Sequence, residues 1–242
     1  MRIQLITITG ADDEVHPNLL KIISDEYNFL EWGILISRKH GKPRQGLRYP
    51  SVAWLEELGK IGKKAAGHFK YSIHICGEYS YDMILRGEES AFFSEIPRPF
   101  IENASRCQLN INIKRLREGY QGALIVPSIL YDRNTILQAN DNNAELIGQV
   151  APSGFDILYD ASGGRGTEIK TLEPPFPGIF TGYSGGLGPD NIREVLSQIE
   201  VMPDVIGYPY GCWVDMETKV RSADRIDLKK VLEVLEISKE FI

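Results

Sequence analysis

Apolar and polar positions follow one another along the chain in two patterns, one typical of strands and one typical of helices. Residues 2–9 alternate with the period of a strand, and residues 19–23 then follow the spacing of a helix. Repeated along the chain, this reading predicts eight strands, at 2–9, 32–36, 71–76, 106–113, 122–130, 155–160, 178–183 and 205–214. Further helices are predicted at 51–65, 80–86, 100–105, 142–149 and 227–240.

Eight strands with intervening helices indicate a parallel sheet, which closes most simply into a (β/α)8 barrel without edge strands. The length of 242 residues agrees with this, because barrels of about 250 residues are typical. No low-complexity linker or repeat marks a boundary, so we expect residues 1–242 to form a single domain. An open, doubly wound sheet is the alternative.

Polar side chains recur at every second position of several predicted strands. Residues two apart point the same way in a strand, so each set shares one face. If these faces point inward, the mouth of the barrel is a polar pocket; if they point outward, local hydrogen bonds satisfy them. The residues concerned are Thr7 and Thr9, His74 and Cys76, Gln108, Asn110 and Asn112, and Asp160.

A glycine turn follows the seventh predicted strand. Gly185 and Gly186 allow a tight turn and leave N–H groups uncovered by side chains. Pro189 suits the first position of a helix, and residues 192–199 then carry an apolar stripe. N–H groups at a helix N-terminus bind anions, typically phosphate. The alternative is an ordinary turn without a ligand, because isolated glycine motifs are weak signals.

Composition and charge narrow the classes of partner. The net charge of −6 argues against a nucleic-acid-binding surface. No apolar run approaches the ~20 residues that span a bilayer. Because residues 2–9 are predicted to form a strand, we expect no signal peptide. Three widely spaced cysteines suit free thiols in a reducing compartment. We expect a cytoplasmic monomer or homodimer that binds a small molecule and uses no metal or cofactor.

Two loops at the predicted mouth suit a ligand. The loop after the sixth strand, 162–167, is rich in glycine, which allows either close approach of a ligand or simple flexibility. The loop after the second strand is basic and suits an anionic ligand, although a solvated surface loop is the alternative. Its residues are Arg38, Lys39, His40, Lys42, Arg44, Gly46 and Arg48.

Together, these motifs resemble phosphoribosylanthranilate isomerase, a TIM-barrel enzyme of tryptophan biosynthesis, in order and spacing across nearly the whole chain. The matching runs are Gly185–Asn191, Val214–Asp215, Asp160 with the loop 163–166, Arg48–Ser51 and Gln108–Leu109.

The resemblance implies an intramolecular isomerase of the aldose–ketose type, in which Asp160 protonates the opening sugar ring. Taken together, the polar strand faces, the two loops and the glycine turn predict a substrate site formed by Thr7, Arg48, His74, Gln108, Asn110 and Gly164. They also predict a phosphate site formed by Gly185, Gly186, Thr218 and Lys219.

The chain departs from the family at two points. The family's general base is a cysteine at the end of the first strand, where this chain has Thr9, whose hydroxyl does not titrate near neutrality. Cys76 and His74, on the third predicted strand, are the candidates to replace this base, although their spacing does not prove it. After the eighth strand, Glu217 stands where the family has small residues around the phosphate, and it repels an anion unless it points away.

We therefore expect an isomerase-type enzyme with an altered base and an altered substrate that is phosphorylated or phosphoribosyl-like. The alternatives are a lyase, epimerase or aldolase on the same scaffold, and a non-catalytic barrel that binds a phosphosugar or nucleotide.

Overall fold

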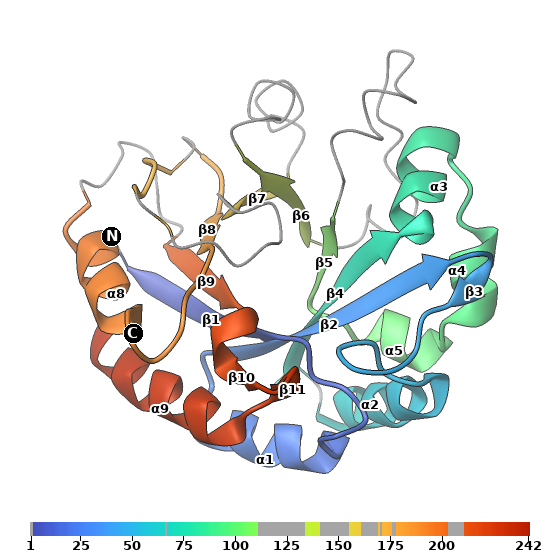
Figure 1. Cartoon of the computed structure of the whole chain (residues 1–242), viewed down its shortest axis with the longest axis horizontal. Coiled ribbons are helices and arrows are strands. Elements are labelled where there is room, and N and C mark those ends of the chain that lie inside the picture. The colour runs from blue at the N-terminus through green and yellow to red at the C-terminus, as the bar shows by residue number, and fades with distance from the viewer. Residues whose placement is uncertain are drawn as a thin grey trace.

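The computed structural model describes residues 2–65, 67–110, 134–140, 155–160, 169, 171–175, 178–202 and 211–242. Eight parallel strands close into a barrel, and β1 pairs with both β2 and β9, so the ring has no edge (Figure 1). These strands are β1 (Ile3–Thr9), β2 (Leu30–Lys39), β4 (Lys70–Gly77), β5 (Arg106–Leu109), β6 (Asn134–Ala139), β7 (Asp156–Asp160), β8 (Thr181–Ser184) and β9 (Cys212–Met216). The expected (β/α)8 barrel is confirmed.

Helices cover the outside of the strands, and α8, α9, α1 and α2 follow one another around the barrel in Figure 1. On α8, Ile192, Val195, Leu196 and Ile199 are buried, as the apolar stripe predicts. The helices are α1 (Pro17–Glu26), α2 (Val52–Ala65), α3 (Glu78–Arg86), α4 (Ser90–Glu95), α5 (Arg98–Glu102), α8 (Ile192–Glu200) and α9 (Leu228–Ser238). The remaining short elements are β3 (Lys42–Pro43), η3 (Thr218–Val220), β10 (Arg221–Ser222), β11 (Arg225–Ile226) and η4 (Lys239–Phe241).

The fifth strand of the barrel is β6, Asn134–Ala139, rather than the predicted 122–130, which lies outside the described residues. A search for a continuous apolar run does not find this strand. Gln138 faces the pocket at the barrel mouth, and Asn134 at the strand's start is exposed, so polar residues interrupt the pattern. The predicted helix 142–149 also lies outside the described residues, and α4 was not predicted.

The helix after the glycine turn begins at Ile192, so Pro189 lies in the turn and not at the first helical position. The Asn191 side chain stabilises this longer turn. Its Oδ1 accepts from the Gly188 N–H at 3.0 Å, and its Nδ2 donates to the Gly186 carbonyl at 2.9 Å. Asn191 therefore closes the turn onto itself instead of capping an earlier helix start.

The interior of the barrel contains a small apolar cluster of Ile136, Leu158 and Trp213, with Leu5 and Phe180 packed against it. A buried ion pair lies beside this cluster, towards the amino ends of the strands. Arg106 on β5 contacts Glu31 on β2 with an Nη2–Oε1 distance of 2.7 Å, and its guanidinium lies 4.2 Å from the Trp213 ring centroid.

Two further hydrogen bonds stabilise the carboxylate of this ion pair. Thr7 and Ser105 each donate a hydroxyl hydrogen bond to Glu31. Burial by itself would raise the pKa of Glu31, but the charge and hydrogen bonds of Arg106 hold it below its usual range. We name Glu31, Arg106, Thr7 and Ser105 the deep polar layer.

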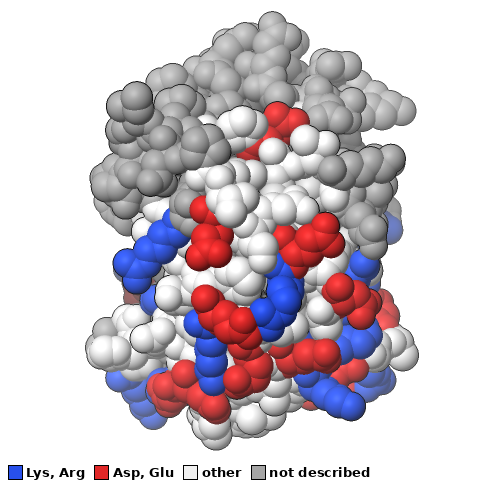
Figure 2. Space-filling model, turned by 90° about the vertical axis from the view of Figure 1, so that its left-hand side faces the viewer, with Lys and Arg blue, Asp and Glu red and all other residues white. Residues whose placement is uncertain are grey.

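On the surface that carries α8 and α9, Lys and Arg side chains are interspersed with Asp and Glu (Figure 2). Arg193 and Glu240 form one such pair, with an Nη1–Oε2 distance of 2.6 Å. In the described part of the chain, no helix has both the length and the apolar character needed to cross a bilayer.

Candidate functional site

A pocket of about 80 Å³ opens at the carboxyl ends of the strands, and all eight strands of the barrel contribute to its wall. Five residues of the predicted polar faces, Thr9, His74, Gln108, Asn110 and Asp160, line this pocket. Of the residues predicted from the sequence, the pocket brings together Thr9, His74, Gln108, Asn110, Asp160, Gly185, Gly186 and Thr218. The residues that were not predicted are Leu35, Gln138, Leu158, Ser184, Asp215, Met216 and Glu217.

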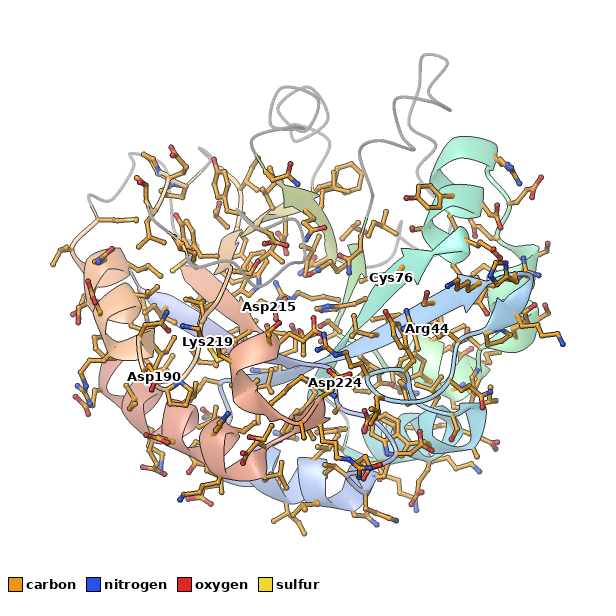
Figure 3. All side chains as sticks on the ribbon, in the orientation of Figure 1. Arg44, Cys76, Asp190, Asp215, Lys219 and Asp224 are labelled. Carbon is orange, nitrogen blue, oxygen red and sulfur yellow. The ribbon has the colours of Figure 1, made fainter. Side chains whose placement is uncertain are left out.

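Four predicted site residues lie away from the pocket wall. Thr7 belongs to the deep polar layer and contacts Glu31. Cys76 lies beside Asn110, across the mouth from Asp215 (Figure 3). Arg48 and Lys219 do not line the pocket, and the Lys219 side chain packs over Gly188. Gly164 and Asn112 lie outside the described residues.

Thr9 and Asp215 form a buried pair on the neighbouring strands β1 and β9. The Thr9 hydroxyl donates to Oδ1 of Asp215 at 2.7 Å. Gly33 on β2 makes room for this arrangement, because a Cβ there would lie 2.1 Å from the Thr9 hydroxyl and 2.8 Å from the His74 ring. Burial raises the pKa of Asp215 to about 7, although the Thr9 hydrogen bond lowers it in part.

Asp160 lies in the same layer of the barrel as Asp215. Asp160 is in register with Ser184, and Ser184 is in register with Asp215, so β8 alone separates the two carboxyl groups along the wall. Asp160 is buried and accepts a hydrogen bond from the Gln138 amide. Two carboxyl groups thus face one pocket from strands about 10 Å apart, at the usual strand spacing.

Gln108 presents an unused acceptor to the pocket. Its amide nitrogen donates to Oδ1 of Asn110 at 2.8 Å, while its Oε1 is buried and has no hydrogen-bond partner among the described residues. The side chain is only 3% exposed. A buried polar atom without a partner is costly, so this oxygen suits a donor supplied by a ligand, such as a hydroxyl group.

His74 and Cys76 are both uncharged at neutral pH. Burial lowers the pKa of His74 to about 4, and its Nε2 lies 3.0 Å from the Ser72 hydroxyl. Burial raises the pKa of Cys76 to about 12, so the reactive thiolate is scarce. Neither side chain is therefore tuned to remove a proton near pH 7.

The turn after β8 has the backbone that an anion site requires. Gly185 has a φ of 129° and Gly186 a φ of 59°, values that favour glycine. Both residues and Thr218 line the pocket, and no acceptor for the N–H groups of Gly185 and Gly186 is seen among the described residues. Glu217 lines the same wall, and burial raises the pKa of its carboxyl.

Two arginines of the predicted basic loop, Arg38 and Arg48, have acidic partners. Arg48 contacts Glu217 with an Nη1–Oε1 distance of 2.7 Å and also pairs with Asp224. Arg38 lies 3.3 Å from Glu95, measured between Nη2 and Oε1. Arg44 stacks on the Tyr49 ring. Arg48 thus reaches a residue of the pocket wall, Glu217, and both Arg38 and Arg48 are paired with carboxylates.

Asp215 is the most important pocket residue that was not among the predicted site residues. The sequence does contain a signal for it, because Asp215 directly follows the predicted strand 205–214 and belongs to the Val214–Asp215 run of the family resemblance. Within the described residues, no group of three or more His, Cys, Asp or Glu side chains is arranged to hold a metal ion.

The fold and site define a (β/α)8 barrel with a polar pocket at the carboxyl ends of its strands. No protein-family model matches the chain, and no curated protein matches its sequence. Solved structures share the fold. N-(5'-phosphoribosyl)anthranilate isomerase from Pyrococcus furiosus aligns at 15% identity and a TM-score of 0.50, covering 98% of this chain and 99% of that chain.

Two other barrels are equally similar in shape. 3-Hexulose-6-phosphate synthase from Salmonella typhimurium aligns at 9% identity and a TM-score of 0.50, over 98% of this chain and 100% of that chain. Concanavalin B aligns at 11% identity and the same TM-score, over 98% of this chain and 99% of that chain. Because the neighbours differ in function and identity is low, the likeness shows the fold alone.

Proposed function

We propose that the protein is an isomerase-type enzyme, similar to phosphoribosylanthranilate isomerase, that acts on a phosphorylated or phosphoribosyl-like small molecule. The observation that carries the proposal is the pair of buried carboxyl groups, Asp160 and Asp215, in one pocket. Conversion of an aldose or aminoaldose into a ketose needs an acid and a base at neighbouring atoms. Two carboxyl groups in different surroundings can supply both roles.

In this proposal Asp160 is the acid that protonates the ring oxygen. His74, Gln108 and Asn110 hold the hydroxyl groups of the sugar, and the unused acceptor of Gln108 supports this role. The phosphate group binds the N–H groups of Gly185 and Gly186 beside Thr218, with Lys219 nearby. Arg48 would act at the rim, after release from Glu217, and Gly164, which lies outside the described residues, would contribute from the glycine-rich segment 162–167 of the sequence.

The proposal is tested with a panel of phosphorylated aldoses and aminoaldoses, including D-ribose 5-phosphate and N-(5'-phosphoribosyl)anthranilate. Binding is measured by thermal shift, and loss of the C2 proton in D2O is followed by NMR. We expect at least one member to bind and exchange in the wild type, and exchange to be lost in Asp160→Asn. Asp25→Asn on exposed α1 is the matched control. Failure of every member to bind would contradict the proposal.

A non-catalytic barrel that binds a phosphosugar or nucleotide is the second candidate. It is favoured by the uncharged states of His74 and Cys76 and by the hydroxyl of Thr9, none of which is an efficient base. Binding of a panel member without C2 exchange would support this candidate. Exchange with inversion or bond cleavage, instead of conversion to a ketose, would indicate an epimerase, lyase or aldolase.

A further inference from the structure

The proposed reaction needs a base, and the three residues considered from the sequence do not provide one. Thr9 has a hydroxyl that does not ionise near neutrality, and His74 is a weak base with a pKa of about 4. Cys76 is a neutral thiol outside the pocket wall. The base must therefore come from another residue that faces the pocket.

We infer that Asp215 is the general base of the proposed reaction and that Thr9 is its positioning residue. The inference rests on the proposed function and assigns the step that this function leaves open. It also explains the departure at the end of β1. In this chain the base lies on the last strand, β9, next to the first strand, which carries the base in the family. The residue at the family's base position, Thr9, orients it.

The geometry supports both roles. Thr9 fixes Oδ1 of Asp215 by a hydrogen bond of 2.7 Å. Oδ2 accepts no hydrogen bond from any described residue, although Asp215 lines the pocket. One carboxylate oxygen is thus held in place while the other is left to take a proton from a bound molecule. A carboxylate held in this way is preorganised, because few of its orientations are unproductive for proton transfer.

The surroundings of Asp215 suit a base that works near neutral pH. Burial raises its pKa to about 7, and the negative charges of Glu217 and Glu31 act in the same direction. The Thr9 hydrogen bond and the positive charge of Arg106 oppose them. Among the other titratable groups in the pocket, His74 is neutral and carries no opposing charge at pH 7. A pKa near the working pH gives the most efficient proton transfer.

The proposed conversion of an aminoaldose starts from the form in which Asp160 carries a proton and Asp215 is a carboxylate. Asp160 gives its proton to the ring oxygen, the C1–O bond breaks, and the nitrogen lone pair forms a C1–N double bond. Asp215 removes the C2 proton, and the electrons of that bond form a C1–C2 double bond while nitrogen regains its lone pair. The C2 hydroxyl then returns a proton to Asp160, and Asp215 delivers its proton to C1. The product is an aminoketose, and both carboxyl groups are restored.

The test uses the panel member that the wild type exchanges fastest, with the pH dependence of C2 exchange as the readout. We expect Asp215→Asn to slow exchange by about 10²-fold or more while the thermal shift caused by the ligand is retained. Thr9→Ser keeps the hydrogen bond and should stay close to the wild type. Thr9→Val removes it and should move the rising limb of the pH profile to higher pH, because a hydrogen bond to the charged form lowers the pKa.

The outcomes separate the inference from the proposed function. If an active wild type loses less than about threefold in Asp215→Asn, the base is assigned wrongly and the proposed function stands. If Thr9→Val leaves the pH profile in place, the positioning role is wrong. If the wild type exchanges no panel member, the proposed function fails and the assigned base fails with it.

Discussion

The barrel contains two buried polar layers, and they differ in how far their hydrogen-bonding capacity is used. In the deep polar layer, Arg106 and Glu31 face each other, and two hydroxyl groups complete the shell of the carboxylate. At the mouth, Asp215 and Gln108 each keep an oxygen without a partner among the described residues. Both layers therefore contain buried polar groups. The layer at the mouth is distinguished as a candidate site by oxygen atoms that have no hydrogen-bond partner among the described residues.

In the deep part of the barrel too, two atoms have no hydrogen bond within the described part of the chain, namely Nη1 of Arg106 and Oδ2 of Asp156. These two atoms lie 3.9 Å apart, so each has an opposite charge nearby. Burial raises the pKa of Asp156 to about 6, which places its titration between that of a surface carboxyl and that of Asp215. The deep layer is therefore held by charge even where hydrogen bonds are missing.

The largest expected effect comes from breaking the deep layer. Arg106→Met leaves the buried charge of Glu31 without compensation and should lower the free energy of unfolding by about 3–5 kcal/mol. The double variant Arg106→Met, Glu31→Leu removes both charges and should recover part of this loss. Urea unfolding at pH 7 measures both. A single variant as stable as the wild type would mean that the ion pair is not structural.

The next effect concerns the pH dependence of stability at the mouth. The folded pKa of Asp215, about 7, lies above its unfolded value of 3.8, so the folded state binds the proton more tightly. This contribution is fully present below pH 3.8 and is lost as pH rises through about 7. Relative to Asp215→Asn, the wild type should lose roughly 2–4 kcal/mol of unfolding free energy over this range.

The comparison with Asp215→Asn is necessary because the contribution of His74 to stability changes with pH in the opposite direction. Its folded pKa of about 4 lies below its unfolded value of 6.5, so its contribution to stability rises with pH over this window. The difference between the two proteins, measured by urea unfolding from pH 4 to 8, cancels the His74 contribution. A constant difference across this range would show that Asp215 titrates as an ordinary carboxyl.

The third prediction tests whether Asp160 belongs to the site or to the fold. Asp160→Asn keeps the shape of the side chain, so we expect a change in unfolding free energy within about 1 kcal/mol. Exchange or ligand binding should fall by about 10²-fold, the usual contribution of a general acid. Melting temperature and affinity are measured on the same preparation. Loss of stability with unchanged affinity of the folded fraction would place Asp160 in the structural layer.

The smallest effect concerns the glycine turn. Glu217→Gln removes a negative charge from the pocket wall and leaves Arg48 with one carboxylate partner fewer. The affinity for inorganic phosphate, measured by calorimetry, should rise about tenfold or less. Glu240→Gln on the surface is the matched control. If phosphate binds neither protein, the turn is not an anion site.

Much of the fold could be predicted from the sequence, because strands with apolar faces show their period directly. Residues 2–9 and 71–76 agree closely with β1 and β4. The prediction was wrong at β6, because a strand that carries polar residues at the barrel mouth has no clean apolar run. The start of α8 was also missed, since the side-chain hydrogen bonds of Asn191 decide it and periodicity does not reveal them.

The site could be predicted in part for the same reason. The alternation of side chains along a strand places Thr9 and Gln108 at the pocket. The same alternation also selects Thr7, which lies one layer deeper in the barrel. Which layer a residue occupies depends on the stagger of neighbouring strands. The role of Asp215 depends on its contact with Thr9 across β1 and β9, which no local pattern contains.

The contact between Thr9 and Asp215 joins residues 206 positions apart, on the first and last strands of the ring. It can form only once β9 has paired with β1, which is the closure that completes the barrel. Contacts this distant in sequence form slowly, because the loop entropy must be overcome first. A chain in which β9 has not yet paired with β1 therefore lacks the contact that holds Asp215. A ligand that needs both carboxyl groups binds only the closed ring, and by mass action it draws the folding equilibrium towards closure.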